Sequence, residues 1–349
     1  MPPSFSTLTP RALDRVGIDL EALRRDPAAR LIVRRWRRLT GGRRTLVAVS
    51  GGADSSALAL TLASAEPAAL VIGHVRHEMR TEQETAEDRD AVVALAERLG
   101  APMVEARIGS IEGNEEDAAR RARRSALTVL ARERECVAVA VGHTADDQAE
   151  TVLMSLMRGA GPRGLAGMPE SCQLGEGIRL VRPMLACMRG DAERLCRLAG
   201  HDWREDRTNL DETRARAFLR ARVIPELRSR WPRGVERSAA AAGLLADAAG
   251  LIEDRAREVF GASLGWRREA LVRERDIVIG DGLRSAWRRL TGGAGADRLS
   301  QRRVGVVLAC IRDTQMRDRV FRWPGGVRVQ VGARLVTMRR TETEKETPA

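Results

Sequence analysis

Two short polar stretches of this chain carry residues that could do chemistry. The first is SGGADS at residues 50–55, which directly follows the apolar segment TLVAV. Its two glycines can adopt positive φ angles and let a ligand approach the backbone closely. If a helix follows, its free N–H groups attract an anion, and the carboxylate of Asp54 can join such a site through a bridging cation such as Mg²⁺. The stretch therefore predicts a phosphate-binding loop.

The common nucleotide loops differ from this one. A Walker A loop requires a lysine, and the single lysine of the chain, Lys345, lies near its C-terminus. The GxGxxG pattern of dinucleotide-binding loops does not fit residues 50–55 either. The alternative is a purely structural turn in which Ser50 or Asp54 caps the following helix.

The second polar stretch, GHTADDQAET at residues 142–151, follows the apolar segment CVAVAV. Asp147 and Glu150 are three residues apart, which puts both carboxylates on one face of a helix. The alternative is helix capping, because Thr144 and Asp147 have the spacing of a capping box. Capping alone does not explain His143, so we expect functional side chains here in addition to a cap.

Short apolar segments alternate with longer amphipathic ones from residue 45 onward. Strands are expected at 45–50, 68–75, 102–108 and 136–143, and helices at 54–63, 81–99, 115–134 and 146–157. The alternation predicts the α/β class, with a parallel sheet flanked by helices in a Rossmann-like arrangement. Ligands of such sheets bind at the carboxyl ends of the strands, where both polar stretches lie.

The chain is expected to divide into four parts. These are a helical N-terminal extension (1–42), the catalytic α/β domain (43–225), a smaller basic α+β domain (226–340) and a disordered tail (341–349). Residues 231–340 contain 22 arginines against 12 acidic residues, which is most of the net charge of +12. Such an excess predicts a polyanionic partner.

Other classes of protein are disfavoured by composition. The N-terminus lacks the apolar core of a signal peptide, and no apolar run approaches the ~18 residues of a membrane span, so we expect a cytoplasmic protein without membrane contact. The five cysteines form no CxxC pair and are expected to be reduced structural thiols. The oligomeric state stays open, with a homodimer as one arrangement.

Several motifs together resemble a known family. SGGADS resembles the SGGxDS pyrophosphate loop (PP-loop) of the N-type ATP pyrophosphatases, which split ATP into AMP and pyrophosphate. VGHTADDQAETVLMSLMRGAGPRGLAGM (141–168) resembles the GHxxDDQxET…RGxGxxGLxGM signature of tRNA(Ile)-lysidine synthetases. Five further motifs of that family occur here in the same order along the chain. They are HVRHEMR (74–80), NEEDAARRARR (114–124), RP (182–183), REDRTN (204–209) and RARAFLR (214–220). The resemblance extends from about residue 44 to 225, and the departures from it are Arg76, Glu78, Arg124 and Ala217.

The resemblance implies an ATP-dependent ligation of free lysine to the wobble cytidine of an isoleucine tRNA with a CAU anticodon. The implied ATP ligands are Ser50, Gly51, Gly52, Ala53, Asp54 and Ser55, with Mg²⁺ held on the pyrophosphate by Asp54. Lysine and the base would be bound by Asp146, Asp147, Gln148 and Glu150, and the catalytic groups would be Asp54, Asp147, Glu150 and His143, the last as a proton relay. The implied tRNA contacts are Arg120, Arg123, Arg124, Arg182, Arg216 and Arg220, and the basic domain at 226–340 is expected to bind the tRNA as well.

Three rival functions remain at this point. A tRNA thiolase of the same superfamily is the nearest, although five scattered cysteines suit sulfur transfer poorly. A small-molecule ligase would leave the basic C-terminal part without a purpose. A non-catalytic RNA-binding protein would have no use for Asp54, Asp147 and Glu150 together.

Overall fold

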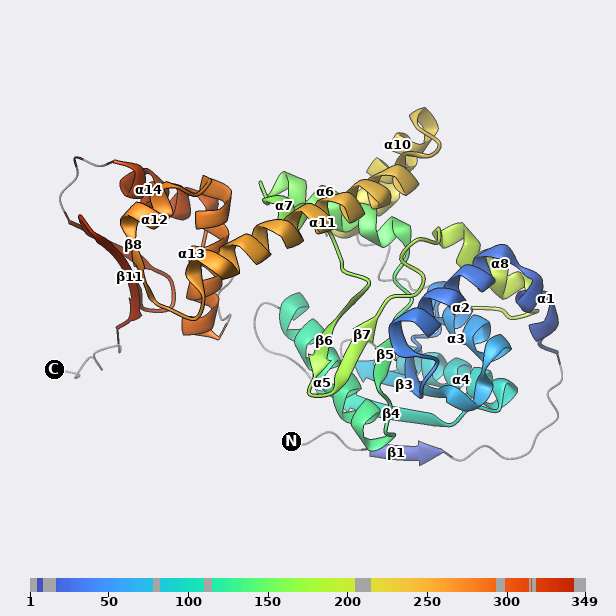
Figure 1. Ribbon diagram of the computed structural model, residues 1–349. Coiled ribbons are helices and arrows are strands. Elements are labelled where there is room, and N and C mark those ends of the chain that lie inside the picture. The colour runs from blue at the N-terminus through green and yellow to red at the C-terminus, as the bar shows by residue number, and fades with distance from the viewer. Residues whose placement is uncertain are drawn as a thin grey trace. The chain divides into compact units, whose positions relative to one another are not determined.

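The computed structural model (Figure 1) describes residues 5–8, 17–77, 82–109, 115–204, 215–292, 299–313, 315 and 318–341. Contacts divide the chain into two compact units. One comprises Met1–Met154 and Gly167–Ala241, and the other comprises Ser155–Ala166 and Ala242–Ala349. This division does not follow the expected limits, because the first unit includes the N-terminal extension and continues past residue 225.

The first unit is built on a seven-stranded sheet with the strand order β1-β4-β3-β2-β5-β7-β6. Its strands are β1 (Phe5–Leu8), β2 (Thr45–Ala48), β3 (Leu70–His77), β4 (Met103–Ile108), β5 (Ala138–Ala140), β6 (Ser171–Gly175) and β7 (Ile178–Val181). The five central strands are parallel, and the two edge strands, β1 and β6, are antiparallel to their neighbours. The predicted α/β class is confirmed, and the two antiparallel edges were not predicted.

Helices cover both faces of this sheet. The helices of the first unit are α1 (Leu20–Arg25), α2 (Pro27–Thr40), α3 (Ala53–Ala65), α4 (Glu82–Leu99), α5 (Glu115–Glu133), α6 (Ala145–Met157), α8 (Arg189–Leu198), α9 (Ala215–Phe218) and α10 (Ile224–Arg230). Helix α5 packs on one face against apolar residues of β2, β3 and β4, while α1, α2, α3, α4 and α8 pack on the other.

The N-terminal helices belong to the core of the first unit. Helix α2 begins where the Asp26 carboxylate accepts the N–H groups of Ala28 and Ala29, and it ends at Gly41, which has φ 69°. Between these ends, Ile32 and Trp36 are fully buried in the same cluster as α3. Burying two large apolar side chains in this way stabilises the fold by several kcal/mol, on the order of 1.5–3 kcal/mol for each.

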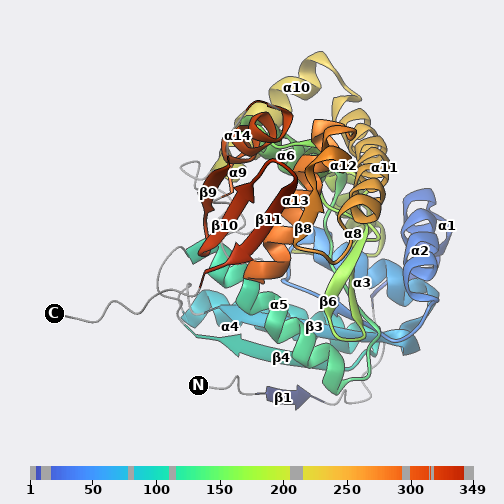
Figure 2. The ribbon, with the colours of Figure 1, turned by 60° about the vertical axis from the view of Figure 1, so that its left-hand side comes forward.

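The second unit has an antiparallel sheet with helices packed on one face (Figure 2). Its strands, in the order β8-β11-β10-β9, are β8 (Gly265–Arg267), β9 (Arg319–Trp323), β10 (Val327–Val331) and β11 (Leu335–Arg340). Its helices include α7 (Pro162–Leu165), most of α11 (Gly234–Phe260), α12 (Arg268–Val272), α13 (Asp276–Thr291) and α14 (Gln301–Arg312). The predicted smaller α+β part is confirmed.

Candidate active site at the carboxyl ends of β2 and β5

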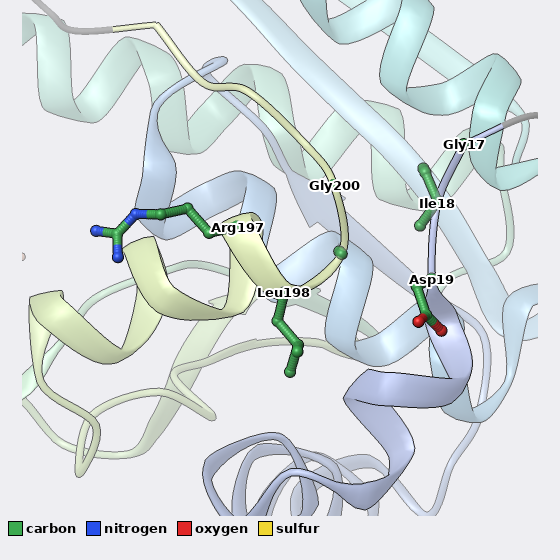
Figure 3. Close-up of a pocket in the computed structure, with 7 residues that line it drawn as sticks. Gly17, Ile18, Asp19, Arg197, Leu198 and Gly200 are labelled. Atoms are coloured by element: carbon green, nitrogen blue, oxygen red, sulfur yellow. The ribbon is translucent and has the colours of Figure 1, made fainter.

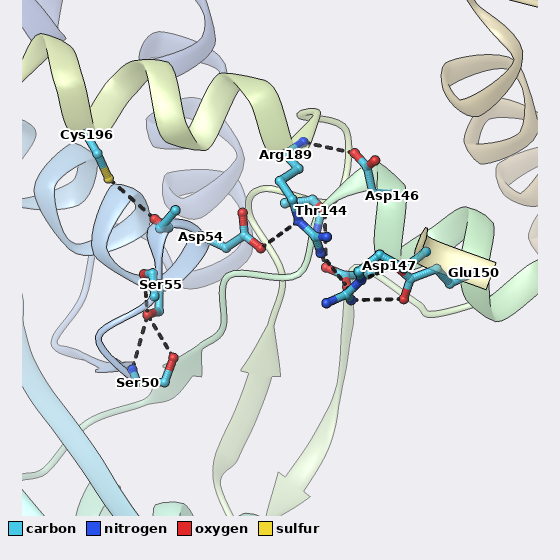
Figure 4. Close-up of polar contacts among 12 residues, drawn as sticks. Ser50, Asp54, Ser55, Thr144, Asp146, Asp147, Glu150, Arg189 and Cys196 are labelled. Atoms are coloured by element: carbon cyan, nitrogen blue, oxygen red, sulfur yellow. Dashed lines mark hydrogen bonds and ion pairs between the residues drawn. The ribbon is translucent and has the colours of Figure 1, made fainter. Parts of the chain in front are cut away.

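One surface hollow does not contain the predicted residues. This hollow of about 570 Å³ (Figure 3) lies in the first unit and is lined by Gly17, Ile18, Asp19, Arg197, Leu198, Ala199 and Gly200. The predicted residues meet instead where β2 and β5 end (Figure 4). The candidate active site therefore lies at that end of the sheet.

The loop between β2 and α3 has the conformation that its glycines predict. Gly51 has φ 91°, a value that favours glycine, and Gly52 precedes the first residue of α3. The Ser55 hydroxyl accepts the N–H of Ser50 at 3.1 Å and lies 3.0 Å from the Gly52 carbonyl oxygen, to which it donates. These hydrogen bonds within the loop fix its conformation. The free N–H groups of the first turn of α3 can then face an anion.

Neighbouring elements hold this loop in place. His74 on β3 is buried, and its Nδ1 donates to the Val49 carbonyl oxygen at 2.8 Å, just before the loop. Burial lowers the pKa of His74 although the hydrogen bond to Val49 opposes this shift, so the ring is neutral at neutral pH and Nδ1 carries its hydrogen. The backbone N–H of Arg204 donates to the Gly51 carbonyl oxygen at 3.0 Å, and the Arg204 guanidinium pairs with Glu87 on α4 at 2.7 Å.

Gly142 is a further site residue that sequence reasoning did not select. A Cβ atom at this position would lie 2.7 Å from the carbonyl oxygen of Asp54 and 3.0 Å from the backbone nitrogen of Ser55. Real Cβ atoms do not approach backbone atoms so closely, so the loop after β5 can pack against α3 only through a glycine. Its place directly before His143 in the second polar stretch was the available signal.

The Asp54 carboxyl group is partly buried at the first turn of α3. Its Oδ1 is buried and has no hydrogen-bond partner among the described residues, while its Oδ2 lies 3.5 Å from Nε of Arg189. Burial raises the pKa of Asp54 to about 6, with the charge of Asp147 acting in the same direction and that of Arg189 opposing it. A buried carboxylate oxygen without a partner, next to a phosphate-binding loop, fits a ligand of a hard cation such as Mg²⁺.

Arg189, at the start of α8, lies between the two polar stretches (Figure 4). Its guanidinium is 3.5 Å from Asp54 and 3.6 Å from Oδ1 of Asp147. Arg189 was not predicted as a site residue, although a cation in the first turn of a helix opposes the helix dipole and so needs acidic partners nearby. Arg189 therefore joins the carboxylates that follow β2 and β5.

Asp147 acts both as a helix cap and as a site residue. Its Oδ2 accepts the backbone N–H of Thr144 at 2.8 Å and the Thr144 hydroxyl at 3.1 Å, which confirms the predicted capping contact. Its Oδ1 faces Arg189, Arg216 and Arg220 at 3.2–3.7 Å. Burial raises the pKa of Asp147, but His143, the Thr144 N–H and Arg189 together bring it below its ordinary value. The group is therefore ionised at neutral pH.

Glu150 is fully buried and bound by two arginines. Nε of Arg216 lies 2.7 Å from its Oε2, and Nε of Arg220 lies 2.8 Å from its Oε1. Both carboxylate oxygens are thus engaged, so the geometry does not support Glu150 as a lysine-binding or catalytic group. It also does not support Arg216 and Arg220 as tRNA contacts, because these guanidinium groups attach the helical segment after residue 214 to α6.

Asp146 and Gln148 hold the backbone of neighbouring segments. Asp146 accepts the N–H of Arg189 at 2.9 Å and forms an ion pair with Arg228. The Gln148 amide oxygen accepts the N–H of Met168 at 2.8 Å, and its nitrogen donates to the Met168 carbonyl oxygen at 3.2 Å. Both residues thus have a structural role, and their role in binding lysine or the base stays a prediction.

His143 is a hydrogen-bond donor rather than a base. Nε of Arg182 donates to Nδ1 of His143 at 3.1 Å, so in the neutral ring Nε2 carries the hydrogen. Burial, together with the charges of Arg182, Arg216 and Arg120, lowers the pKa of His143 to about 4 against the opposing charge of Asp147. The ring cannot accept a proton readily at neutral pH, which argues against the predicted proton relay.

The remaining predicted arginines fall into two groups. Arg182 is 2% exposed and also donates to the Pro169 carbonyl oxygen at 2.7 Å, so it supports His143 and does not reach the surface for tRNA. On α5, Arg120 and Arg123 are exposed, and the half-buried Arg124 donates to the Gln173 carbonyl oxygen at 3.4 Å. Predicted motif residues at 78–80, 114 and 205–214 lie outside the described residues.

The cysteines are unpaired and mostly buried. Burial raises the pKa of Cys136 and Cys187 to about 11 and that of Cys196 to about 12, which keeps these thiols protonated. The predicted structural thiols are consistent with these environments. Separately, no helix within the described ranges is long and apolar enough to cross a membrane.

Known proteins share these features. Residues 28–227 match the family model described as a PP-loop domain. The tRNA(Ile)-lysidine synthase of Salinispora tropica is 37% identical over 297 residues, which are 81% of this chain and 87% of the relative. Relatives of the same name from Deinococcus deserti and Symbiobacterium thermophilum are 42% and 38% identical over 63% and 70% of this chain, which spans 40% and 52% of their longer sequences.

A solved structure with a similar fold is a U34-tRNA thiolase from Methanococcus maripaludis. It has a TM-score of 0.54 and 17% sequence identity, and the match covers 65% of this chain and 80% of the thiolase. At this identity the likeness concerns the fold alone. On the sequence matches, together with the loop after β2 and the polar stretch after β5, the chain belongs to the tRNA(Ile)-lysidine synthase family of PP-loop proteins.

Proposed function

We propose that this protein uses ATP to join free lysine to the wobble cytidine of an isoleucine tRNA with a CAU anticodon. The observation that carries the proposal is the meeting of Asp54, Arg189 and Asp147 at the end of the sheet, next to the loop after β2. The proposed phosphate-binding loop and a carboxylate that could bind the lysine ammonium, that of Asp147, thus belong to one site. The chain that carries them is a member of the lysidine synthase family.

In the first step, the 2-carbonyl oxygen of the cytidine attacks the α-phosphorus of ATP. A bond forms between this oxygen and phosphorus, and the bond to the β-phosphate oxygen breaks, so pyrophosphate leaves. N–H groups at the start of α3, with the loop closed by Ser50 and Ser55, suit the charge that develops on pyrophosphate. Asp54 would hold Mg²⁺, which neutralises phosphate charge when bound.

In the second step, the ε-amine of lysine attacks carbon 2 of the adenylylated base, and AMP leaves. Free lysine has an amine pKa of ~10.4, so it arrives as an ammonium and must lose a proton. Among the acids of the second polar stretch, Asp147 has the longest ion-pair distances, because the three guanidinium groups that face its Oδ1 lie 3.2–3.7 Å away. We assign the ammonium to this oxygen, in exchange for Arg189.

His143 contributes a hydrogen bond in this scheme. Its Nε2–H is directed by the Arg182 contact at Nδ1, and the ring stays neutral because burial and nearby arginines lower its pKa to about 4. Such a donor suits the negative charge of a phosphate or a leaving group. The proton of lysine must therefore pass to solvent or to the departing phosphate, because the lowered pKa of Asp147 makes its carboxylate no better a base than His143.

Sulfur transfer to a tRNA base is the second candidate within this fold. A thiolase that uses its own cysteines needs accessible thiols with a low pKa. Here Cys136, Cys187 and Cys196 are buried and have raised pKa values, and Cys172 contacts the buried Arg182 at 3.8 Å. These environments favour the lysine ligation.

The test is transfer of radiolabelled lysine to an isoleucine tRNA transcript with the CAU anticodon, in the presence of ATP and Mg²⁺. We expect label in the tRNA and stoichiometric pyrophosphate release, both lost in Asp54→Asn. A transcript with uridine at the wobble position is the RNA control and should stay unlabelled. Pyrophosphate release without lysine incorporation by folded protein would contradict the proposal and favour another nucleophile.

A further inference from the structure

Three arginines lie directly opposite one another on adjacent strands of the second unit. The register pairs Arg322 of β9 with Arg328 of β10, and Arg328 with Arg339 of β11. Directly paired residues point to the same side of a sheet with Cβ atoms about 5 Å apart, so the three guanidinium groups form a row across the strands. We call these three residues the arginine row.

The arginine row lies on the face of the sheet opposite the core. Residues at alternate positions, such as Val327, Val329 and Met338, are buried against helices α13 and α14. Arg322 and Arg339 are exposed and Arg328 is half-exposed, as is expected for the other face of the same strands. Figure 2 shows β9, β10 and β11 side by side in this order.

The arginine row has no acidic partners in the part of the chain that the structure describes. Strands β8, β9, β10 and β11 contain no aspartate or glutamate, and the only described polar contact of the row is Arg339 with the Gln330 amide oxygen at 3.3 Å. Like charges directly opposite each other on a sheet are destabilising. The sequence therefore retains an unfavourable arrangement at this face.

Three arginines on the helices of the same unit are paired with acids. Arg255 pairs with Glu258 at 2.8 Å, Arg257 pairs with Asp254 at 2.6 Å, and Arg273 pairs with Glu269. An arginine-rich composition alone would give both surfaces the same character. Among the described residues, the arginine row lacks the acidic neighbours that these three helix arginines have, which suits the approach of an anionic partner.

We infer that the arginine row binds the phosphate backbone of the tRNA substrate. This inference rests on the proposed function, which supplies an RNA partner. Guanidinium groups on adjacent strands can contact successive phosphates by charge-assisted hydrogen bonds, and such contacts position an RNA without reading its bases. The row therefore contributes affinity that is independent of the anticodon and decreases with salt.

The test replaces all three residues together, Arg322→Gln, Arg328→Gln and Arg339→Gln. The affinity of the full-length protein for the isoleucine tRNA is measured by filter binding between 50 and 300 mM KCl. We expect the Kd near physiological salt to rise roughly 10- to 100-fold, and the slope of log Kd against log salt to fall by about two to three. A methionine tRNA should lose affinity by a similar factor, since the backbone is common to both.

The matched control removes the same charge from paired positions: Arg255→Gln, Arg257→Gln and Arg273→Gln. This variant should change the Kd by less than about threefold, because its arginines are already neutralised by acids. Circular dichroism and thermal unfolding check that both variants are folded, and single substitutions in the row replace the triple variant if it is not.

The outcomes separate this inference from the proposed function. If the parental protein binds no tRNA, this result contradicts the proposed function, and the arginine row then has no RNA partner. Parental protein that binds and modifies tRNA, with an unchanged Kd and salt slope in the row variant, overturns the inference alone. A loss confined to the isoleucine tRNA would also overturn it, because backbone contacts cannot make that distinction.

Discussion

Gly142 and Asp54, which belong to different motifs, are in backbone contact: a Cβ on Gly142 would lie 2.7 Å from the Asp54 carbonyl oxygen. In Gly142→Ala, either the loop after β5 or the start of α3 must therefore move. A displacement near 1 Å in a catalytic site can lower the rate about 100-fold. We expect lysine transfer to fall by about that factor, measured as kcat/KM for ATP, while the overall fold is kept.

The control for this substitution is Gly243→Ala in α11, where a Cβ would meet no atom within 4 Å. Alanine is the better helix former, so this variant should be as stable as the parent or slightly more stable, with unchanged lysine transfer. Equal activity of the two glycine variants would contradict the proposed packing requirement at Gly142.

Asp54→Asn should increase stability at neutral pH while abolishing pyrophosphate release. The folded-state pKa of about 6 is above the ordinary value of 3.8, so the folded protein binds more protons than the unfolded chain between these values. Its stability therefore falls as the pH rises from about 4 to 6, and Asn removes this loss. The gain is on the order of 1–3 kcal/mol at pH 7.5 and should vanish below pH 4.

Thermal unfolding of parent and Asp54→Asn at pH 7.5 and pH 4 measures this difference. Asp254→Asn, an exposed acid of α11 paired with Arg257, is a suitable control and should show no comparable pH-dependent gain. If Asp54→Asn is less stable than the parent at pH 7.5, the burial assigned to this carboxyl group is wrong.

His143 should titrate near pH 4 and stay neutral throughout the physiological range. In Arg182→Gln, loss of the nearby positive charge should raise the pKa of His143, since Arg182 lowers it in the parent. NMR titration of the histidine ring resonances measures both values. His74, which binds the Val49 carbonyl oxygen, is the internal control and should keep its own lowered pKa.

The same property has a kinetic consequence. If His143 acts only as a hydrogen-bond donor, the rate of lysine transfer should not depend on a group that titrates near pH 6.5. The pH profiles of the parent and of His143→Gln should then have the same shape in this range. Dependence on such a group in the parent, lost in His143→Gln, would restore a proton-relay role for this residue.

Glu150→Gln should act mainly on stability. It leaves the guanidinium groups of Arg216 and Arg220 without a full counter-charge, and removing one partner of a buried ion pair costs about 3 kcal/mol. We expect this loss in the free energy of urea unfolding, together with a small change in KM for lysine in the protein that remains folded. A large increase in KM at unchanged stability would instead return Glu150 to the lysine site.

A double-mutant cycle with Arg216→Gln separates the pair from other effects. If the two residues act through their 2.7 Å contact, the double variant should lose less stability than the sum of the two single losses. Additive losses would show that the contact contributes little.

Local pattern in the sequence was sufficient for the α/β class, for the glycine turn before a helix at 50–55 and for the cap formed by Thr144 and Asp147. Each depends on residues close together in the chain: apolar segments of strand or helix length, two glycines before a helix, and an i, i+3 spacing. The edge strands β1 and β6 escaped prediction, since their pairing depends on partners elsewhere in the chain.

Tertiary structure alone decided which acids of the second polar stretch remain available for a ligand. The partners of Glu150 and Asp146, Arg216 and Arg228, are 66 and 82 residues away in sequence, so no local spacing reveals them. Burial decided the rest: it makes Arg182 a support for His143 rather than a surface contact, and it raises the pKa of Asp54. The sequence determines the sign of each side-chain charge. Whether that charge is paired depends on packing between segments that are distant in the sequence.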